Sequence, residues 1–197
     1  MLTEYNFLSY MQKRIVALEA IMPLREELQT YLAQNRQTCN VNEGDFLLTP
    51  GQTSSKIYFI ETGLVRGYYL NNGKELTTGF MKEGDFVISP VSFFRNRPSF
   101  EYLQLLEDSR LYALCRDLLF EAYERFAEFN KIGRIVTEEY YVRSELRTHY
   151  MRGQTAAEKY STFLAEYAAI INRVPIQHIA SFLGITPETL SRIRAKR

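Results

Sequence analysis

The sequence predicts an α+β chain that consists of an antiparallel β-roll with helices before it, a long helix, and a C-terminal helix-turn-helix. Three observations lead to this prediction. Glycines separate short β-like runs between residues 39 and 114, a proline-free helical pattern covers residues 130–151, and the last two dozen residues carry the start and stop signals of two short helices. We expect a sensor domain over 1–128, a dimerisation helix over 129–151 and a helix-turn-helix domain over 152–197.

The first 35 residues have helical periodicity. Apolar side chains recur every three or four positions, at Leu8, Met11, Ile15, Leu18 and Ile21. Pro23 interrupts the pattern, which resumes in LREELQTYLAQ. We therefore expect two short helices between about residues 5 and 35.

Turn signals divide the next segment into strands. Asn71-Asn72-Gly73 lies between two β-like runs and favours a tight hairpin, because Asn and Gly accept positive φ angles. The pairs Gly44-Asp45 and Gly84-Asp85 each precede an apolar run and predict two similar corners of the roll. We interpret the glycines as turns because no Walker or dinucleotide-binding spacing is present.

The helical pattern over 130–151 carries a stripe of alternating three- and four-residue spacing, as in a two-helix coiled coil. We expect this stripe to form a dimer interface, and its members are Ile132, Ile135, Glu139, Val142, Leu146 and His149. Phe129, Val136 and Tyr140 form a second stripe that could lie on the β-roll. A long helix buried wholly within one subunit is the alternative.

The C-terminal segment begins with a predicted helix, AAEKYSTFLAEYAAIINR, which Thr155 can cap. A second helix follows in IQHIASFL, and Gly184 can take the left-handed conformation that ends it. Thr186 is then a candidate N-cap for a third helix, in which Pro187 suits the first turn. The outward positions of this last helix fit the major groove of DNA. The predicted DNA-binding residues are Thr186, Glu188, Thr189, Arg192, Arg194, Lys196 and Arg197. A helical hairpin that only covers a core is the alternative.

Charge is unevenly distributed along the chain, whose net charge is +1. Residues 1–130 hold 13 Lys and Arg against 17 Asp and Glu, a balance of −4, and residues 131–197 hold 11 against 6, a balance of +5. A polyanion is therefore attracted to the C-terminal part of the chain.

Composition argues against several other classes of protein. No apolar run approaches the roughly 20 residues that span a bilayer, and no secretory signal is evident, so we expect a cytoplasmic protein with no membrane partner. Cys39 and Cys115 are too few for an iron–sulfur cluster held by four thiolates, and we expect two buried, reduced thiols. A cupin-like metalloenzyme would need several histidines on strands, but His149 and His178 both lie on predicted helices. No Gly-x-Ser-x-Gly elbow is present. We therefore expect no catalytic residues, no metal and no cofactor.

The order of these parts resembles the Crp/Fnr superfamily of bacterial transcription regulators, and within it the short Bacteroidetes-type members. SKIYFIETGLVRGYYLNNGKELTTGFMKEGDFV is similar to the family's cyclic-nucleotide-binding jelly roll, and IASFLGITPETLSRIRAKR is similar to its DNA-reading helices. The resemblance implies a homodimer that binds double-stranded DNA, with RNA polymerase and an unidentified small-molecule effector as candidate partners. It also implies that Glu188 and Arg192 read bases.

The resemblance fails at the phosphate-binding cassette. Counting from Phe86, the family's Gly-Glu pair is replaced by Ile88 and Ser89, and its Arg-Ser pair is replaced by Ser99 and Phe100. A buried cyclic phosphate would then lack its guanidinium partner, so we expect no control by cyclic nucleotide. A different effector could lie in the roll, in a pocket that we assign to Tyr58, Tyr69, Phe80, Ser89, Ser99 and Tyr102. The rival function is a non-enzymatic sensor or interaction module whose DNA binding is weak or lost.

Overall fold

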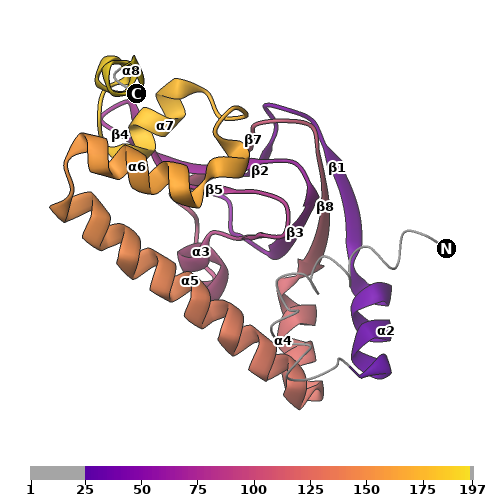
Figure 1. Cartoon of the computed structure of the whole chain (residues 1–197). Helices are drawn as coiled ribbons and strands as arrows, with labels where there is room; N and C mark the ends of the chain where they lie inside the picture. The colour runs from indigo at the N-terminus through magenta and orange to yellow at the C-terminus, as the bar shows by residue number, and fades with distance from the viewer. Residues whose placement is uncertain (1–24, 196–197) are drawn as a thin grey trace. The chain divides into compact units, whose positions relative to one another are not determined.

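The computed structural model describes residues 25–195 and divides into two compact units. Unit 1 comprises Met1–Arg66 with Phe80–Val136, and unit 2 comprises Gly67–Gly79 with Thr137–Arg197. Figure 1 shows the order of the elements along the chain. The predicted helix before Pro23 lies outside the described residues, as do Lys196 and Arg197.

The β-roll consists of two four-stranded sheets. The first has the strand order β1-β8-β3-β6, and the second has the order β2-β7-β4-β5. The pairs β1–β8, β2–β7, β3–β6 and β3–β8 are antiparallel, which confirms the predicted antiparallel roll. The strands are β1 (Gln37–Val41), β2 (Phe46–Leu48), β3 (Lys56–Thr62), β4 (Val65–Asn71), β5 (Lys74–Met81), β6 (Phe86–Val87), β7 (Glu101–Leu105) and β8 (Ser109–Cys115).

The two Gly-Asp corners have the same hydrogen-bond pattern. Gly44 and Gly84 have φ angles of 86° and 83°, and they donate N–H bonds of 3.0 Å to the carbonyls of Leu105 and Ile60 respectively. Each of these two residues in turn donates to the carbonyl of the aspartate that follows the glycine. The prediction of two similar corners is confirmed.

The β4–β5 connection is a two-residue loop. Asn72 and Gly73 have φ angles of 51° and 75°, and β4 ends at the residue before them. Two successive positive φ angles are the signature of a type I′ turn, which matches the twist of a hairpin. The hairpin prediction is therefore confirmed.

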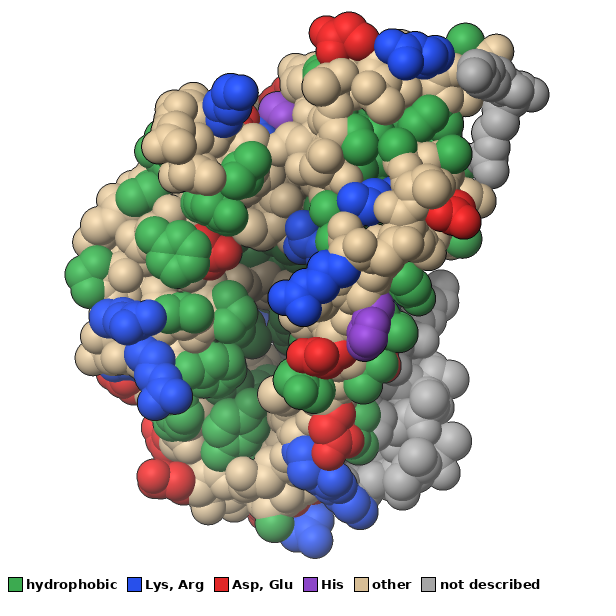
Figure 2. All heavy atoms as spheres, turned by 90° about the vertical axis from the view of Figure 1, so that its left-hand side faces the viewer, with side chains coloured by type: hydrophobic (Ala, Val, Ile, Leu, Met, Phe, Trp, Pro, Cys, Tyr) green, Lys and Arg blue, Asp and Glu red, His purple; other side chains and the backbone are tan. Residues whose placement is uncertain are grey.

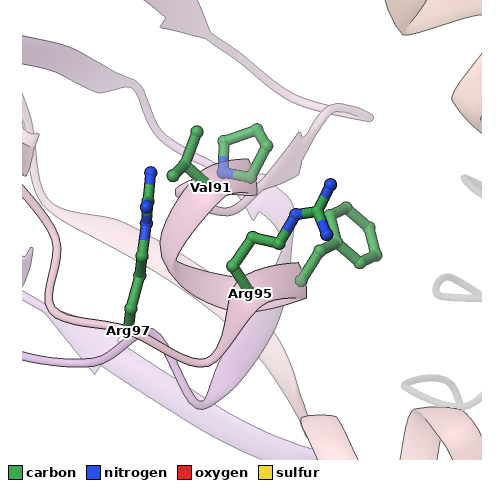
Figure 3. A pocket seen from close by; sticks show the side chains of 5 residues that line it. Val91, Arg95 and Arg97 are labelled. Atoms are coloured by element: carbon green, nitrogen blue, oxygen red, sulfur yellow. The ribbon is translucent and has the colours of Figure 1, made fainter.

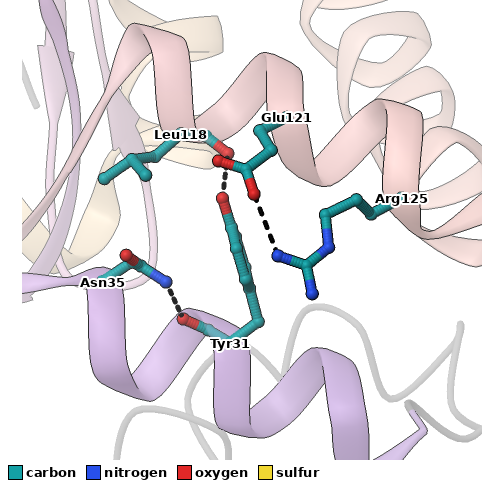
Figure 4. Close-up of polar contacts among 5 residues, drawn as sticks. All are labelled: Tyr31, Asn35, Leu118, Glu121 and Arg125. Carbon is teal, nitrogen blue, oxygen red and sulfur yellow. Dashed lines mark hydrogen bonds and ion pairs between the residues drawn. The ribbon is translucent and has the colours of Figure 1, made fainter.

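The core of unit 1 has two parts. One lies in the roll and contains Leu48, Ile60, Val65, Val87, Leu103, Leu105 and Leu111. The other joins the roll to α2 (Glu26–Asn35), α4 (Arg116–Arg125) and the first turns of α5 (Ala127–Gly153). Within it the Tyr31 hydroxyl donates a 3.0 Å bond to the Leu118 carbonyl (Figure 4). Desolvation, followed by the nearby Glu121 carboxylate, raises the pKa of Tyr31.

Two short helices lie where no helix was predicted. They are α3 (Pro90–Arg95), between β6 and β7, and α4, which directly follows β8. The side chains of their N-cap residues, Ser89 and Cys115, make no capping hydrogen bond. Cys115 gives no start signal for α4, whereas Ser89-Pro90 is a typical helix start from which no helix was predicted. Helix α5 begins three residues before the predicted stretch and continues to Gly153.

The prediction of buried cysteines needs correction. Cys39 and Cys115 are free thiols, as expected from their number, but both are only half-buried. Cys39 is the central residue of β1, and Cys115 is the last residue of β8.

Unit 2 contains the rest of α5 and a cluster of three helices. These are α6 (Ala156–Glu166), α7 (Ile176–Leu183) and α8 (Pro187–Ala195), with a 3-10 turn at Ala168–Ile170 between the first two. The predicted helix over 156–173 is therefore shorter than expected. Thr155 caps α6 in a reciprocal pair with Glu158, as its position predicted. Across residues 25–195, no helix has the length and apolar character needed to cross a membrane.

Candidate nucleic-acid interface and sensor site

The turn between α7 and α8 is closed by Gly184. This residue has φ 66° and ψ 35°, and its N–H points back to the Ala180 and Ser181 carbonyls. The N–H of Ile185 also donates to the Ala180 carbonyl, at 3.0 Å. This pattern ends a helix with a left-handed residue, a conformation that glycine adopts without a Cβ penalty. The predicted helix-turn-helix is therefore present.

Thr186 fixes the start of α8. Its hydroxyl oxygen accepts a 3.2 Å bond from the Thr189 N–H, and its carbonyl accepts from the Leu190 N–H at 3.0 Å. The Thr186 hydroxyl also lies 3.2 Å from the Thr189 hydroxyl. In this structure Thr186 and Thr189 therefore use their hydroxyls in forming the helix start.

An aromatic cluster joins α6 to α7, two helices that α8 contacts. The ring of Phe182 lies 5.7 Å from that of Phe163 and 5.5 Å from that of Tyr167, centroid to centroid. Leu190 of α8 is fully buried. Leu190 therefore determines which side of α8 faces inward.

The opposite side of α8 is exposed. Glu188, Arg192 and Arg194 are exposed, and Thr189 is half-buried. Glu188 and Arg192 are four residues apart, so they lie about one helical turn from each other on the same side. The hydrogen bond from its own backbone N–H, and then that from the Thr186 hydroxyl, hold the pKa of Glu188 below its usual value. The exposed side of α8 thus presents an ionised carboxylate beside a guanidinium.

The predicted dimer stripe is exposed along most of α5. Glu139 and His149 are exposed, Ile135 is half-buried, and Val142 and Leu146 are 51% and 45% exposed. Figure 2 shows hydrophobic side chains reaching the surface among acidic and basic ones on one face of the molecule. The stripe therefore includes apolar surface that is available to a partner.

Ile132 is a correction to this stripe. It is only 6% exposed and packs in the core of unit 1 with Phe126 and Phe129. Heptad spacing indicates on which face of the helix a side chain lies. It does not indicate whether that face is covered by the same subunit or by a partner. Ile132 is therefore not available to a second copy.

The structure brings together two of the predicted effector-pocket residues. The hydroxyl oxygens of Ser89 and Ser99 lie 3.3 Å apart, and both side chains are buried. Ser89 also donates a 2.6 Å bond to the carboxylate of Glu101. Two of the four places that hold the family's phosphate-binding pairs are thus serines of a small polar cluster, to which Glu101 adds a carboxylate.

The other predicted pocket residues lie elsewhere. Tyr58 is in β3, and burial is the main cause that raises its pKa. Tyr102 packs against Phe46 with ring centroids 5.8 Å apart, Phe80 is buried, and Tyr69 belongs to unit 2. The six residues are therefore not all part of one unit.

An open hollow lies beside α3. Pro90, Val91, Phe94, Arg95 and Arg97 line it, and Figure 3 shows these side chains around the short helix. None of the six predicted pocket residues is among them. In the described part of the chain, no group of three or more His, Cys, Asp and Glu side chains is placed to hold a metal ion.

Three residues that make long-range polar contacts in the structure were not singled out from the sequence: Glu101, Arg147 and Ser181. Glu101 has no motif of its own and acquires its role only when β7 places it beside Ser89. Arg147 and Ser181 belong to helices whose periodic patterns indicated packing, but both bond to the backbone of β5. No local signal could have identified them, because their partners lie 70 or more residues away in the chain.

Comparison with known proteins matches residues 38–126 to the cyclic nucleotide-binding domain family. A comparison with curated proteins gave no match. Among solved structures, FixK2 from Bradyrhizobium japonicum is similar at 19% identity and a TM-score of 0.72, over 82% of this chain and 83% of that one. A regulator of the Crp/Fnr family from Eubacterium rectale has 16% identity and a TM-score of 0.69, over 86% and 82% of the two chains.

A third similar structure is CLP from Xanthomonas campestris, described as a c-di-GMP responsive global regulator. It has 14% identity and a TM-score of 0.69, over 87% of this chain and 91% of that one. At such identities the likeness concerns the fold, and it agrees with the β-roll, long helix and helix-turn-helix described above. Residues 38–126 are therefore similar to the cyclic nucleotide-binding domain family, and the chain has the fold seen in the Crp/Fnr regulators.

Proposed function

We propose that the chain is a DNA-binding transcriptional regulator of the Crp/Fnr type that binds a pseudo-palindromic operator as a homodimer. The observation that carries this proposal is the side of α8 opposite buried Leu190, on which Glu188 and Arg192 are both exposed. A carboxylate accepts from the cytosine amino group, and a guanidinium donates to guanine O6 and N7. The two side chains together can read adjacent base pairs.

The homodimer is proposed from the exposed stripe of α5. Val142 and Leu146 offer apolar surface, and Ile135, Glu139 and His149 continue the same stripe. Two parallel copies of this helix would present α8 twice, with a two-fold relation between the half-sites. The operator half-sites should then lie about 34 Å apart, centre to centre.

Control by a cyclic nucleotide is not part of the proposal. Serines occupy two of the four places of the family's phosphate-binding pairs, and no guanidinium occupies the other two. Both serine hydroxyls already donate to Glu101, so a bound phosphate would lack its usual partners. We propose that any effector is a different kind of molecule. The similar CLP structure is described as c-di-GMP responsive, which is a statement about that protein.

Selection of DNA from a random pool tests the proposal. The expected product is a site with two-fold symmetry, and selected sites without that symmetry would contradict the dimer model. Arg192→Ala should relax preference at one base pair in each half-site, by about 1 to 3 kcal/mol. Arg194→Ala is the matched comparison on the same helix. It should weaken binding to all sequences and reduce the slope of log affinity against log salt by about 1.

A further inference from the structure

Strand β5 is the last strand of its sheet among the described residues, so one edge of it has no strand neighbour. Backbone N–H and C=O groups on such an edge need other partners when they are buried. Thr77, near the middle of β5, is buried. Its backbone groups are bonded to side chains of two helices in the same unit.

Ser181 of α7 makes two hydrogen bonds to this strand edge, one of them to Thr77. Its hydroxyl oxygen accepts a 3.0 Å bond from the Thr77 N–H, and its hydroxyl hydrogen goes to the Glu75 carbonyl at 2.7 Å. A serine hydroxyl can donate one hydrogen and accept others, so one side chain bonds to two groups on the same strand edge. The first helix of the helix-turn-helix is thereby attached to the hairpin.

Arg147 of α5 makes the third bond. Its Nη2 atom donates to the Thr77 carbonyl at 3.2 Å, and its guanidinium carbon lies 4.2 Å from the ring centroid of Phe182 on α7. Burial lowers the pKa of Arg147, and the groups that oppose this are Tyr167, Glu166 and Tyr69. Arg147 therefore contacts both the strand and the helix that Ser181 connects.

We propose that Ser181 and Arg147 are positioning residues for DNA reading, because they fix the hairpin Gly67–Gly79 to α7 and so determine where α8 lies. This inference rests on the proposed DNA binding. Helix α8 follows α7 through the Gly184 turn and is held by buried Leu190, so displacement of α7 moves the reading side chains. The residues of β4 before Gly67 and of β5 after Gly79 belong to unit 1. A conformational change in these strands would therefore be transmitted through the hairpin to α7.

The test combines DNA affinity with hydrogen exchange on the full chain. Ser181→Ala removes the hydroxyl and leaves a better helix former in α7, so weaker helix formation cannot explain a loss. We expect DNA selected by the wild type to bind about three- to tenfold more weakly. The matched control is Ser144→Ala, at an exposed position of α5. It should leave affinity unchanged, and Ser181→Thr, which keeps a hydroxyl, should recover most of the loss.

Hydrogen exchange distinguishes positioning from mere stability. If the hairpin sets the place of α8, bound DNA must in turn hold the hairpin, because coupling between two sites is reciprocal. DNA should therefore slow exchange at the Thr77 amide in the wild type and in Ser144→Ala, and much less in Ser181→Ala. The Arg147→Lys variant keeps the charge but loses the planar group over Phe182, and it should behave as Ser181→Ala does.

The outcomes separate the two proposals. A wild-type protein that selects no DNA would disprove the proposed function, and the positioning role with it. A wild type that binds, together with a Ser181→Ala variant that has the same affinity and the same DNA-dependent protection, would overturn the positioning role alone.

Discussion

The hydroxyl of Ser89, the residue directly before α3, donates a 2.6 Å hydrogen bond to the carboxylate of Glu101. Ser99 adds its own hydroxyl, which donates to the Glu101 carbonyl at 3.2 Å and accepts from the Glu101 N–H at 2.9 Å. Three residues from two segments thus satisfy one another's polar groups. A bound phosphate would have to replace these bonds and lie beside a carboxylate.

Cyclic nucleotides should therefore not bind. Calorimetry with cyclic AMP and cyclic GMP at micromolar concentration should give no heat, because the cluster offers no guanidinium to the phosphate and its serine hydroxyls already donate to Glu101. Glu101→Gln keeps an oxygen that can accept from Ser89 and removes the charge, so it separates the effect of the charge from that of the missing guanidinium. Saturable one-to-one binding by the wild type would show that this reading of the cluster is wrong.

Gly63 should be the least replaceable turn glycine of the roll. Its φ is 119°, and a Cβ built there would lie 1.9 Å from the Ser109 hydroxyl oxygen and 2.8 Å from the Ser109 Cα. Gly63→Ala combines overpacking against backbone with an unfavourable φ, and should lower the free energy of unfolding by about 2 to 5 kcal/mol in chemical denaturation.

Gly73→Ala is the control for that substitution. Gly73 has φ 75° and no atom within 4 Å of the built Cβ, so only the backbone strain applies. The loss should be about 1 to 2 kcal/mol. Equal losses at the two positions would mean that the contact with Ser109 relaxes without cost.

The start of α6 should weaken in acid. The backbone N–H of Thr155, and then its hydroxyl, hold the pKa of Glu158 below 4.5, the ordinary value. Because the pKa of Glu158 is lower in the folded chain than in the unfolded chain, its carboxylate stabilises the fold fully at pH values above the ordinary pKa. This contribution is lost as the pH falls through the folded-state pKa. Denaturation of the wild type at a series of pH values should show this loss. In Glu158→Gln the loss of stability in acid should be smaller. Identical stability-against-pH profiles for the wild type and the variant would show that the capping carboxylate does not cause the loss.

The dimer proposal predicts that a charge on the α5 stripe separates the subunits. Leu146 is 45% exposed in the single chain, so Leu146→Glu should leave the subunit fold within about 0.5 kcal/mol of the wild type. In a paired seam the same carboxylate would be buried without a partner. Sedimentation should show a dimer for the wild type and a monomer for the variant. Ser144→Glu, also exposed on α5, is the control and should remain dimeric.

Local chemistry explains which features could be predicted from the sequence. Asn72-Gly73, the two Gly-Asp corners and Gly184 were found because positive φ angles favour particular residues. Helix α4 was missed because Cys115 is not a capping residue, and α3 was missed although Ser89-Pro90 is a typical helix start. The bonds from Ser181 to β5 join residues 104 and 106 positions apart, and no pattern within a helix encodes such a pairing.

The contacts of Ser181 and Arg147 with β5 have a second consequence, which concerns solubility. An open sheet edge can add a strand from another molecule and begin an aggregate. The edge of β5 that has no strand neighbour in the described part of the chain is covered at Glu75 and Thr77 by hydrogen bonds with side chains of α7 and α5. A truncated chain that ends before α7 would lose the Ser181 block, and it should precipitate at concentrations at which the intact chain stays dissolved.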